Sequence, residues 1–152
     1  MSVVVIGVGN AYRSDDGAGL AVVQRVRAVA PDVEVVTNEQ EPLRLLDAWD
    51  GAELALVVDA VSSGSPPGTI HRFDATEERP PVTVFHGSTH AIGIWDAIDL
   101  ARTLGRLPAR LIVYGIEGER FSAGDGLTPA VSAAVERLVT ELTEELRCTS
   151  VR

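Results

Sequence analysis

Two aspartates and one histidine occupy positions where α/β proteins commonly keep their chemistry. Asp16 ends a glycine-containing stretch that follows the first apolar run, and Asp59 closes another apolar run. His90 stands at the expected start of a helix. Two carboxylates and one imidazole form an O,O,N donor set that suits a borderline divalent metal such as nickel or zinc. The same groups could perform carboxylate-assisted hydrolysis.

The neighbouring aspartates Asp15 and Asp16 are expected to divide their roles. A polar side chain at a helix start commonly accepts a hydrogen bond from the first backbone amides, and Asp15 or Ser14 can do this. The helix needs no second cap. We therefore predict that Asp16 faces the crevice at the edge of the sheet, where Gly17 and Gly19 allow close approach of the backbone.

Each candidate also has a purely structural interpretation. Asp59 could accept a hydrogen bond from a neighbouring loop amide, and His90 could be a helix-start histidine with satisfied hydrogen bonds. His86 precedes a glycine, which indicates a loop, so His90 is the better candidate of the two. His71 lies in an alternating strand pattern and is predicted to be a surface residue.

Three other kinds of site match the sequence less well. A dinucleotide fingerprint would need a third glycine at position 12, where the chain has Tyr12. The Gly-x-Ser-x-Gly motif of serine hydrolases is absent, and Ser88 lacks the strand–turn–helix context of that motif. Cys148 is expected in a terminal helix with no histidine near it in sequence, so we do not predict it to be a nucleophile.

Composition narrows the range of partners. The chain has 13 basic and 22 acidic residues, a formal charge of −9, and its basic residues are arginines spread along the sequence. Binding to nucleic acid or to an anionic membrane needs clustered positive charge, so neither partner is expected. The single cysteine, the absence of a signal-peptide pattern and the lack of about 18 consecutive apolar residues predict a cytoplasmic protein.

The elements that must position the candidates alternate along the chain. Continuous apolar runs predict strands buried on both faces, at residues 3–8, 33–37, 54–59, 69–73 and 111–116. Helical periodicity is found between and after them, at residues 16–30, 89–104 and 129–147. This order predicts one α/β domain over residues 1–152, with helices on both faces of a mostly parallel sheet of about five strands. Because parallel strands end at one edge, Asp16 and Asp59 could converge there.

The order of the motifs resembles that of the maturation endopeptidases of nickel-iron hydrogenases. The matching blocks are GVGN and RSDDGAG within residues 7–19, VVDAV at 57–61, PGT at 67–69, STHAIG at 88–93, YGIE at 114–117 and GLTPAV at 126–131. Each block is modest alone, but together they are specific and span nearly the whole chain. The resemblance implies a three-layer α/β/α sandwich around a five-stranded sheet. It also implies a protease that removes the C-terminal extension of a hydrogenase large-subunit precursor after nickel insertion.

The resemblance further implies roles for the three candidates. Family members are thought to contact nickel through an acidic residue of the first loop, an aspartate after the third strand and a histidine that opens a later helix. By motif these residues are Asp16, Asp59 and His90, which become the expected catalytic and metal-contacting set. The expected metal is nickel carried by the precursor, which is the expected partner, and no organic cofactor is expected.

The chemistry of cleavage and the substrate stay open at this point. Hydrolysis could be of the aspartic type, with Asp16 as the preferred acid/base, or assisted by the metal. The alternatives are a peptide hydrolase of the same fold with another substrate, and a module that checks metal or binds nucleotide without cleavage.

One segment departs from the family pattern. After the second strand, members commonly carry a Gly-Thr-rich turn preceded by an acidic residue, whereas residues 38–42 read NEQEP. The flexible glycine is missing, and two carboxylates, Glu39 and Glu41, are added. Because this segment is expected to line the substrate cleft, the departure indicates a different hydrogenase precursor or another substrate.

Overall fold

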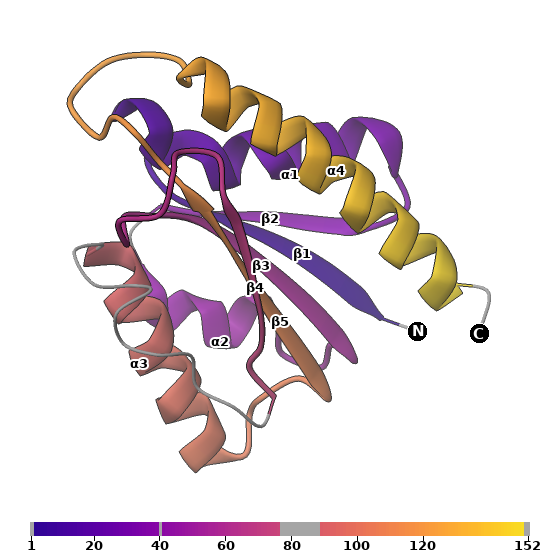
Figure 1. Cartoon of the computed structure of the whole chain (residues 1–152). Helices are drawn as coiled ribbons and strands as arrows, with labels where there is room; N and C mark the ends of the chain where they lie inside the picture. The colour runs from indigo at the N-terminus through magenta and orange to yellow at the C-terminus, as the bar shows by residue number, and fades with distance from the viewer. Residues whose placement is uncertain (1, 40, 77–88, 151–152) are drawn as a thin grey trace.

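A five-stranded sheet with helices on both faces forms the centre of the computed structural model, which describes residues 2–39, 41–76 and 89–150 (Figure 1). The strand order is β2-β1-β3-β5-β4, with β4 antiparallel to β5 and the other neighbours parallel. The strands are β1 (Val3–Val8), β2 (Glu34–Asn38), β3 (Leu54–Val61), β4 (Ile70–Asp74) and β5 (Arg110–Glu117). The helices are η1 (Ser14–Gly17), α1 (Ala18–Val29), η2 (Pro42–Arg44), α2 (Leu45–Ala48), α3 (Thr89–Leu104) and α4 (Pro129–Ser150).

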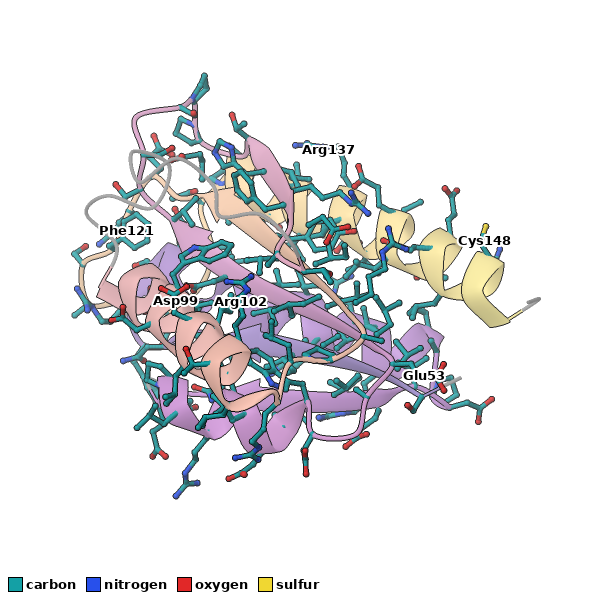
Figure 2. The ribbon with its side chains drawn as sticks, turned by 90° about the horizontal axis from the view of Figure 1, so that it is seen from below. Glu53, Asp99, Arg102, Phe121, Arg137 and Cys148 are labelled. Carbon is teal, nitrogen blue, oxygen red and sulfur yellow. The ribbon has the colours of Figure 1, made fainter. Side chains whose placement is uncertain are left out.

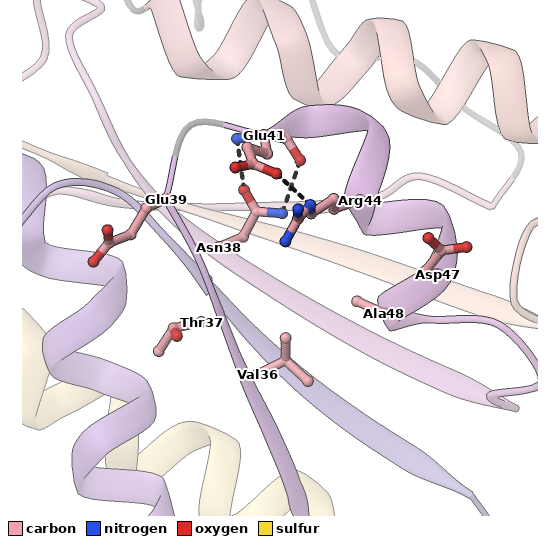
Figure 3. Close-up of a pocket in the computed structure, with 8 residues that line it drawn as sticks. All are labelled: Val36, Thr37, Asn38, Glu39, Glu41, Arg44, Asp47 and Ala48. Atoms are coloured by element: carbon pink, nitrogen blue, oxygen red, sulfur yellow. Dashed lines mark hydrogen bonds and ion pairs between the residues drawn. The ribbon is translucent and has the colours of Figure 1, made fainter.

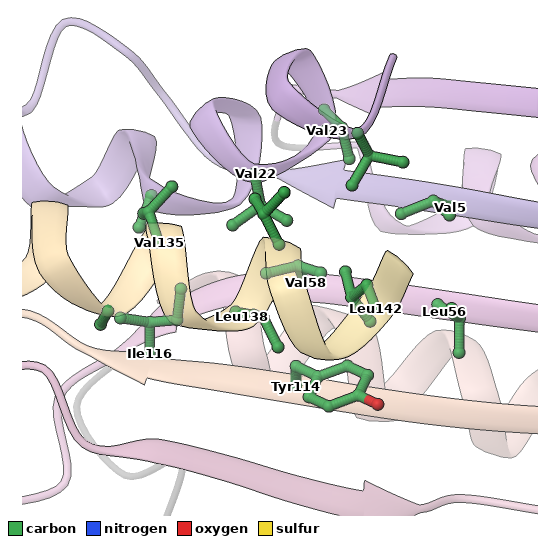
Figure 4. Packing of buried hydrophobic residues seen from close by; sticks show 14 of the residues in the cluster. Val5, Val22, Val23, Leu56, Val58, Tyr114, Ile116, Val135, Leu138 and Leu142 are labelled. Atoms are coloured by element: carbon green, nitrogen blue, oxygen red, sulfur yellow. The ribbon is translucent and has the colours of Figure 1, made fainter. Parts of the chain in front are cut away.

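The helices form two outer layers, which confirms the α/β/α architecture implied by the sequence. Helices α1 and α4 lie side by side on one face, and α2 and α3 on the other (Figure 1). On the first face, Val22 and Leu138 pack with Leu56 and Val58 of β3 (Figure 4). On the other face, Trp49 belongs to the second buried cluster together with side chains of β1, β3 and α3.

The predicted strands are confirmed in position, but the expected burial on both faces is wrong for β2 and β4, which are only partly buried. Some strand ends are also shifted. The largest shift matters for the site: β3 continues to Val61, so Asp59 lies inside the strand rather than at its end. The predicted helix over residues 16–30 is also partly wrong, because it begins as the separate 3-10 helix η1. Val22 and Val26 are buried, whereas Val29, the last residue of α1, is 57% exposed.

The order of the strands reverses at β1, which has β2 on one side and β3 on the other. From β1 the chain passes through α1 to β2 on one side, and then returns to place β3 on the other side of β1. Ligands of open α/β sheets bind beyond the carboxyl ends of the strands at such a reversal. The segments that follow β1 and the carboxyl half of β3 therefore lie at the position favoured for chemistry.

Glycine allows α1 to pack closely at this edge. A Cβ atom at Gly19 would lie 2.6 Å from the carbonyl oxygen of Val8 and closer still to that of Val58. Only a residue without a side chain fits this junction of α1, β1 and β3. Within the described part of the chain, no helix has the length and apolar character needed to span a membrane.

Candidate functional site

Asp16 and Asp59 are both buried at the reversal of the sheet. Asp16 lies on η1 with 4% of its surface exposed, and Asp59 lies in β3 with 0% exposed. The two elements are in contact. The loop before η1 is folded tightly, since the backbone amide of Asn10 donates to the carbonyl oxygen of Asp16 at 3.2 Å. The expected convergence of the two segments is therefore confirmed at the level of the elements.

Asp15 has a role that differs from the predicted one. Neither Asp15 nor Ser14 caps the adjoining helix; the Ser14 hydroxyl instead donates to the carbonyl oxygen of Ser122 at 2.9 Å. The fully buried Asp15 carboxylate accepts hydrogen bonds of 2.7–2.9 Å from the amides of Glu119, Arg120 and Thr128 and from the Thr128 hydroxyl.

These hydrogen bonds set the charge state of Asp15. Burial by itself raises the pKa of the carboxyl group, but the bonds from Thr128, Arg120 and Glu119 outweigh it and lower the pKa below its usual value. Asp15 is therefore an ionised structural anchor for the segment between β5 and α4. Asp16 is buried beside it on η1, and its expected place in the crevice stays a prediction.

Asp59 is oriented by its own strand. One carboxylate oxygen accepts a hydrogen bond of 2.8 Å from the backbone amide of Ala60. The donor is an amide of β3 and not the loop amide of the structural interpretation. Across the ladder, Asp59 faces Gly115 of β5, which brings no side chain beside it.

His90 is described only by its backbone. It is the second residue of α3, a helix that contacts both η2 and β3. A Cβ atom at Gly93, in the first turns of α3, would lie 2.5 Å from Cγ of Pro42, so this end of the helix lies against η2. The His90 side chain and the whole of His86 lie outside the described residues, so the role of His90 stays a prediction. Among the side chains that are described, no group of three histidine, cysteine or acidic residues could hold a metal ion.

A buried carboxylate that the site prediction omitted lies at the end of β5. Glu117 is 1% exposed, and its carboxylate accepts hydrogen bonds from the Ser63 amide at 3.1 Å, the Ser63 hydroxyl and His71 Nε2 at 3.1 Å. The prediction that His71 is a surface residue is therefore wrong, since only 17% of its side chain is exposed. The signal for Glu117 in the sequence was an acidic residue directly after an apolar strand pattern.

A pocket of about 760 Å³ opens beside the segment that departs from the family pattern (Figure 3). The Asn38 amide group holds the turn closed, because it donates to the carbonyl oxygen of Glu41 at 2.9 Å and accepts from the Glu41 amide at 3.0 Å. The Glu41 carboxylate pairs with Arg44. The lining residues are Val36, Thr37, Asn38, Glu39, Glu41, Arg44, Asp47 and Ala48.

Comparison with known proteins places these features in a family. The family model described as HycI, hydrogenase maturation protease, matches residues 21–145. The chain belongs to the hydrogenase maturation protease family. The resemblance found in the sequence is thereby confirmed, and the chain is an endopeptidase of hydrogenase maturation. Asp59 and His90 lie within the matched residues, and Asp16 precedes them.

Individual members of the hydrogenase maturation protease family cover nearly all of this chain. The hydrogenase 2 maturation protease of Escherichia coli (strain K12) is 30% identical over 151 residues, which are 97% of this chain and 92% of that protein. The hydrogenase expression/formation protein HupD of Rhodobacter capsulatus is 32% identical over 153 residues, 95% of this chain and 71% of that protein. The solved structure of the hydrogenase maturating endopeptidase HybD from E. coli matches with a TM-score of 0.86 at 27% identity, over 98% of this chain and 94% of that one.

Cys148 takes no part in this site. It is exposed near the end of α4, and Figure 2 shows it at the opposite end of the molecule from Phe121, which belongs to the segment anchored by Asp15. This separation agrees with the prediction that Cys148 is not the nucleophile.

Proposed function

We propose that this protease removes the C-terminal extension of a nickel-iron hydrogenase large-subunit precursor once nickel has been inserted into the precursor. The observation that carries the proposal is the pair of buried carboxylates, Asp16 on η1 and Asp59 on β3, at the reversal of the sheet. Helix α3, which begins one residue before His90, contacts the same strand. The precursor is the partner, and nickel enters the site as part of the substrate.

The chemistry of these side chains favours a divalent cation. Ionised carboxylates in a buried position gain strongly from a nearby positive charge, because the local dielectric constant is low. Two carboxylates and an imidazole suit nickel, and a set of three protein ligands leaves coordination positions for groups of the substrate. Contact with Asp16, Asp59 and His90 would therefore make cleavage conditional on nickel in the precursor.

Hydrolysis itself needs a water molecule activated next to the scissile carbonyl. A carboxylate can take a proton from that water as a general base and return it to the leaving amine. We assign this role to Asp16, because it lies on a short helix at the opening of the crevice whereas Asp59 lies inside a central strand. Substrate-held nickel could assist by polarising the carbonyl group.

The pocket beside β2 supports the proposal that the precursor of this protease differs from the precursors of its relatives. Glu39, Glu41 and Asp47 contribute three carboxylates to its lining against the single guanidinium of Arg44. Its turn is linked to the site, since the Gly9 amide donates to the carbonyl oxygen of Asn38 at 3.1 Å. We propose that this pocket receives part of a precursor whose sequence differs from those of relatives with a Gly-Thr-rich turn.

The test is cleavage of a nickel-loaded large-subunit precursor, followed by mass spectrometry of the products. Asp16→Asn, Asp59→Asn and His90→Ala are each expected to slow processing by about a hundredfold or more, since each removes a group at the reacting centre. Glu136→Gln, on the exposed surface of α4, is the matched control and is expected to process at the parental rate. Normal processing by all three site variants would show that the site assignment is wrong.

The alternatives give different products in the same experiment. A peptide hydrolase with another substrate leaves the precursor at full length and does not form a complex with it. A module that checks metal without cleavage forms a stable complex with the intact precursor. Both outcomes would contradict the proposed reaction while leaving the family membership unchanged.

A further inference from the structure

Glu117 is the last residue of β5, at the place where the chain crosses from β3 to β4. The chain leaves β3 at Val61 and enters β4 at Ile70, yet β5 lies between these two strands. The connecting segment, residues 62–69, therefore passes over the carboxyl end of β5. Glu117 is the last residue of β5, so its side chain lies at this crossing.

The Glu117 carboxylate joins the two sides of the crossing. It accepts from the amide and hydroxyl of Ser63, just after β3, and from Nε2 of His71 in β4. The backbone of Glu117 is also held by the crossing segment. The Gly68 amide donates to the Glu117 carbonyl oxygen at 2.8 Å, and the Glu117 amide donates to the Thr69 carbonyl oxygen at 2.9 Å. A buried carboxylate with several donors is a strong and geometrically specific anchor.

Ser63, which the Glu117 carboxylate holds, lies four residues after Asp59 in the sequence. The ladder between β3 and β5 ends at the pair Val61 and Glu117, and the Gly118 amide donates to the Val61 carbonyl oxygen at 3.0 Å. Beyond this pair, the Glu117 side chain holds the departing chain at Ser63. The end of β3 that carries Asp59 is thus restrained through its exit, and the Asp59 carboxylate is aligned in turn by the Ala60 amide.

We propose that Glu117 is a positioning residue for the reaction: by joining Ser63 to His71 it fixes the end of β3 and with it the orientation of Asp59. The inference rests on the proposed function only for the role of Asp59. Glu117 does not itself touch substrate. Reacting groups must be held closely in place, and small displacements slow the chemical step far more than they weaken substrate binding.

The structural part is tested by amide hydrogen exchange at Ala60, measured by NMR. Glu117→Ala is expected to speed exchange at Ala60 by about tenfold. Ser63→Ala removes only the hydroxyl donor to Glu117 and is expected to speed this exchange by a smaller factor. The matched control is Glu145→Ala, which breaks another, partly buried network: the bonds from Tyr114 at 2.6 Å and Arg72 at 3.4 Å to the Glu145 carboxylate. This control should leave Ala60 exchange unchanged. Parental exchange at Ala60 in Glu117→Ala would overturn the proposal, whether or not the protein cleaves the precursor.

The catalytic part is tested by processing kinetics at a temperature where every variant is folded. Glu117→Ala is expected to lower kcat about tenfold with KM for the precursor nearly unchanged, and Glu145→Ala to change neither. Glu117→Gln should recover most of the rate, since an amide oxygen can still accept from Ser63 and His71. A glutamine variant as slow as the alanine variant would overturn the proposal, because the charge rather than the geometry would then be needed.

The two proposals fail in different ways. A normal rate in Glu117→Ala together with an inactive Asp59→Asn would reject the positioning role and leave the proposed function standing. A normal rate in Asp59→Asn would reject the role assigned to Asp59, and the exchange at Ala60 would still decide whether Glu117 orders the end of β3.

Discussion

Asp15, which has a structural role, directly precedes Asp16, the carboxylate that we propose for the site. Both are buried, but Asp15 receives four hydrogen bonds from residues more than 100 positions away in sequence. Those bonds connect the loop after β1 to the segment between β5 and α4. The same connection continues in the backbone, since Ser14 donates to Gly124 at 3.0 Å and Gly124 donates to Tyr12 at 3.0 Å.

The anchor at Asp15 predicts a stability that depends on pH. Because its pKa is lowered in the folded protein, the ionised form stabilises the fold above the pKa of the unfolded chain, about 3.9. That contribution is lost as the pH falls through the lower pKa of the folded state. Asp15→Asn is therefore expected to lose about 2–3 kcal/mol at pH 7, and the difference from the parent should shrink below about pH 4. Urea unfolding at several pH values measures both effects.

A neighbouring aspartate provides the control for this experiment. Asp125 lies exposed in the same segment, and Asp125→Asn should change the free energy of unfolding by less than about 0.5 kcal/mol. Equal stability of Asp15→Asn and the parent at pH 7, or a difference that grows on acidification, would contradict the role given to Asp15.

At the scale of the elements, the site depends on how closely α1 approaches the sheet. Gly19→Ala would place a methyl group against the carbonyl oxygens of Val8 and Val58, and backbone atoms cannot rotate away as a side chain can. We expect a loss of about 2–4 kcal/mol on urea unfolding, together with slower processing because η1 and Asp16 must move with α1. Gly51→Ala is the comparison: the space around it is open, and the cost should be about 1 kcal/mol from its positive φ alone. A Gly19→Ala protein with parental stability and rate would show that the packing at this junction is not needed.

The sequence predicted the elements better than it predicted their connections. Strands β1, β3 and β5 were visible because a strand buried on both faces is apolar at nearly every position. Helix α2 and 3-10 helix η2 were missed, since four and three residues are too few to show a helical period. The end of β3 was placed early because an aspartate is unusual inside a strand.

The sequence predicted that the segments carrying Asp16 and Asp59 lie close together, but it did not predict the hydrogen bonds that hold these segments. Asp16 and Asp59 could be expected near one another because the end of β1 and the carboxyl half of β3 lie at one edge of the sheet. The bonds from Thr128 to Asp15 and from His71 to Glu117 join distant segments, and local patterns carry no information on such pairs. Long-range hydrogen bonds of this kind become visible only with the fold.

At the scale of the whole molecule, the net negative charge of the chain agrees with the proposed site. The chain carries a formal charge of −9, and part of that excess lies at the carboxyl edge of the sheet, where Glu39 and Glu41 are exposed on the surface while Asp16 and Asp59 are buried. A surface of this sign favours a partner that brings positive charge to the cleft and raises the rate of its association. A precursor that carries a divalent cation meets that description.

The nickel dependence of cleavage tests the central claim most directly. The same large-subunit precursor is prepared with and without nickel, and initial rates of cleavage are compared for the parent protein and for Asp59→Asn. We expect the parent to cleave the nickel-loaded precursor at least about a hundredfold faster than the metal-free one, and Asp59→Asn to lose most of this preference. Equal cleavage of both precursors by the parent, or an undiminished preference in Asp59→Asn, would contradict the claim that this site senses nickel held by the substrate.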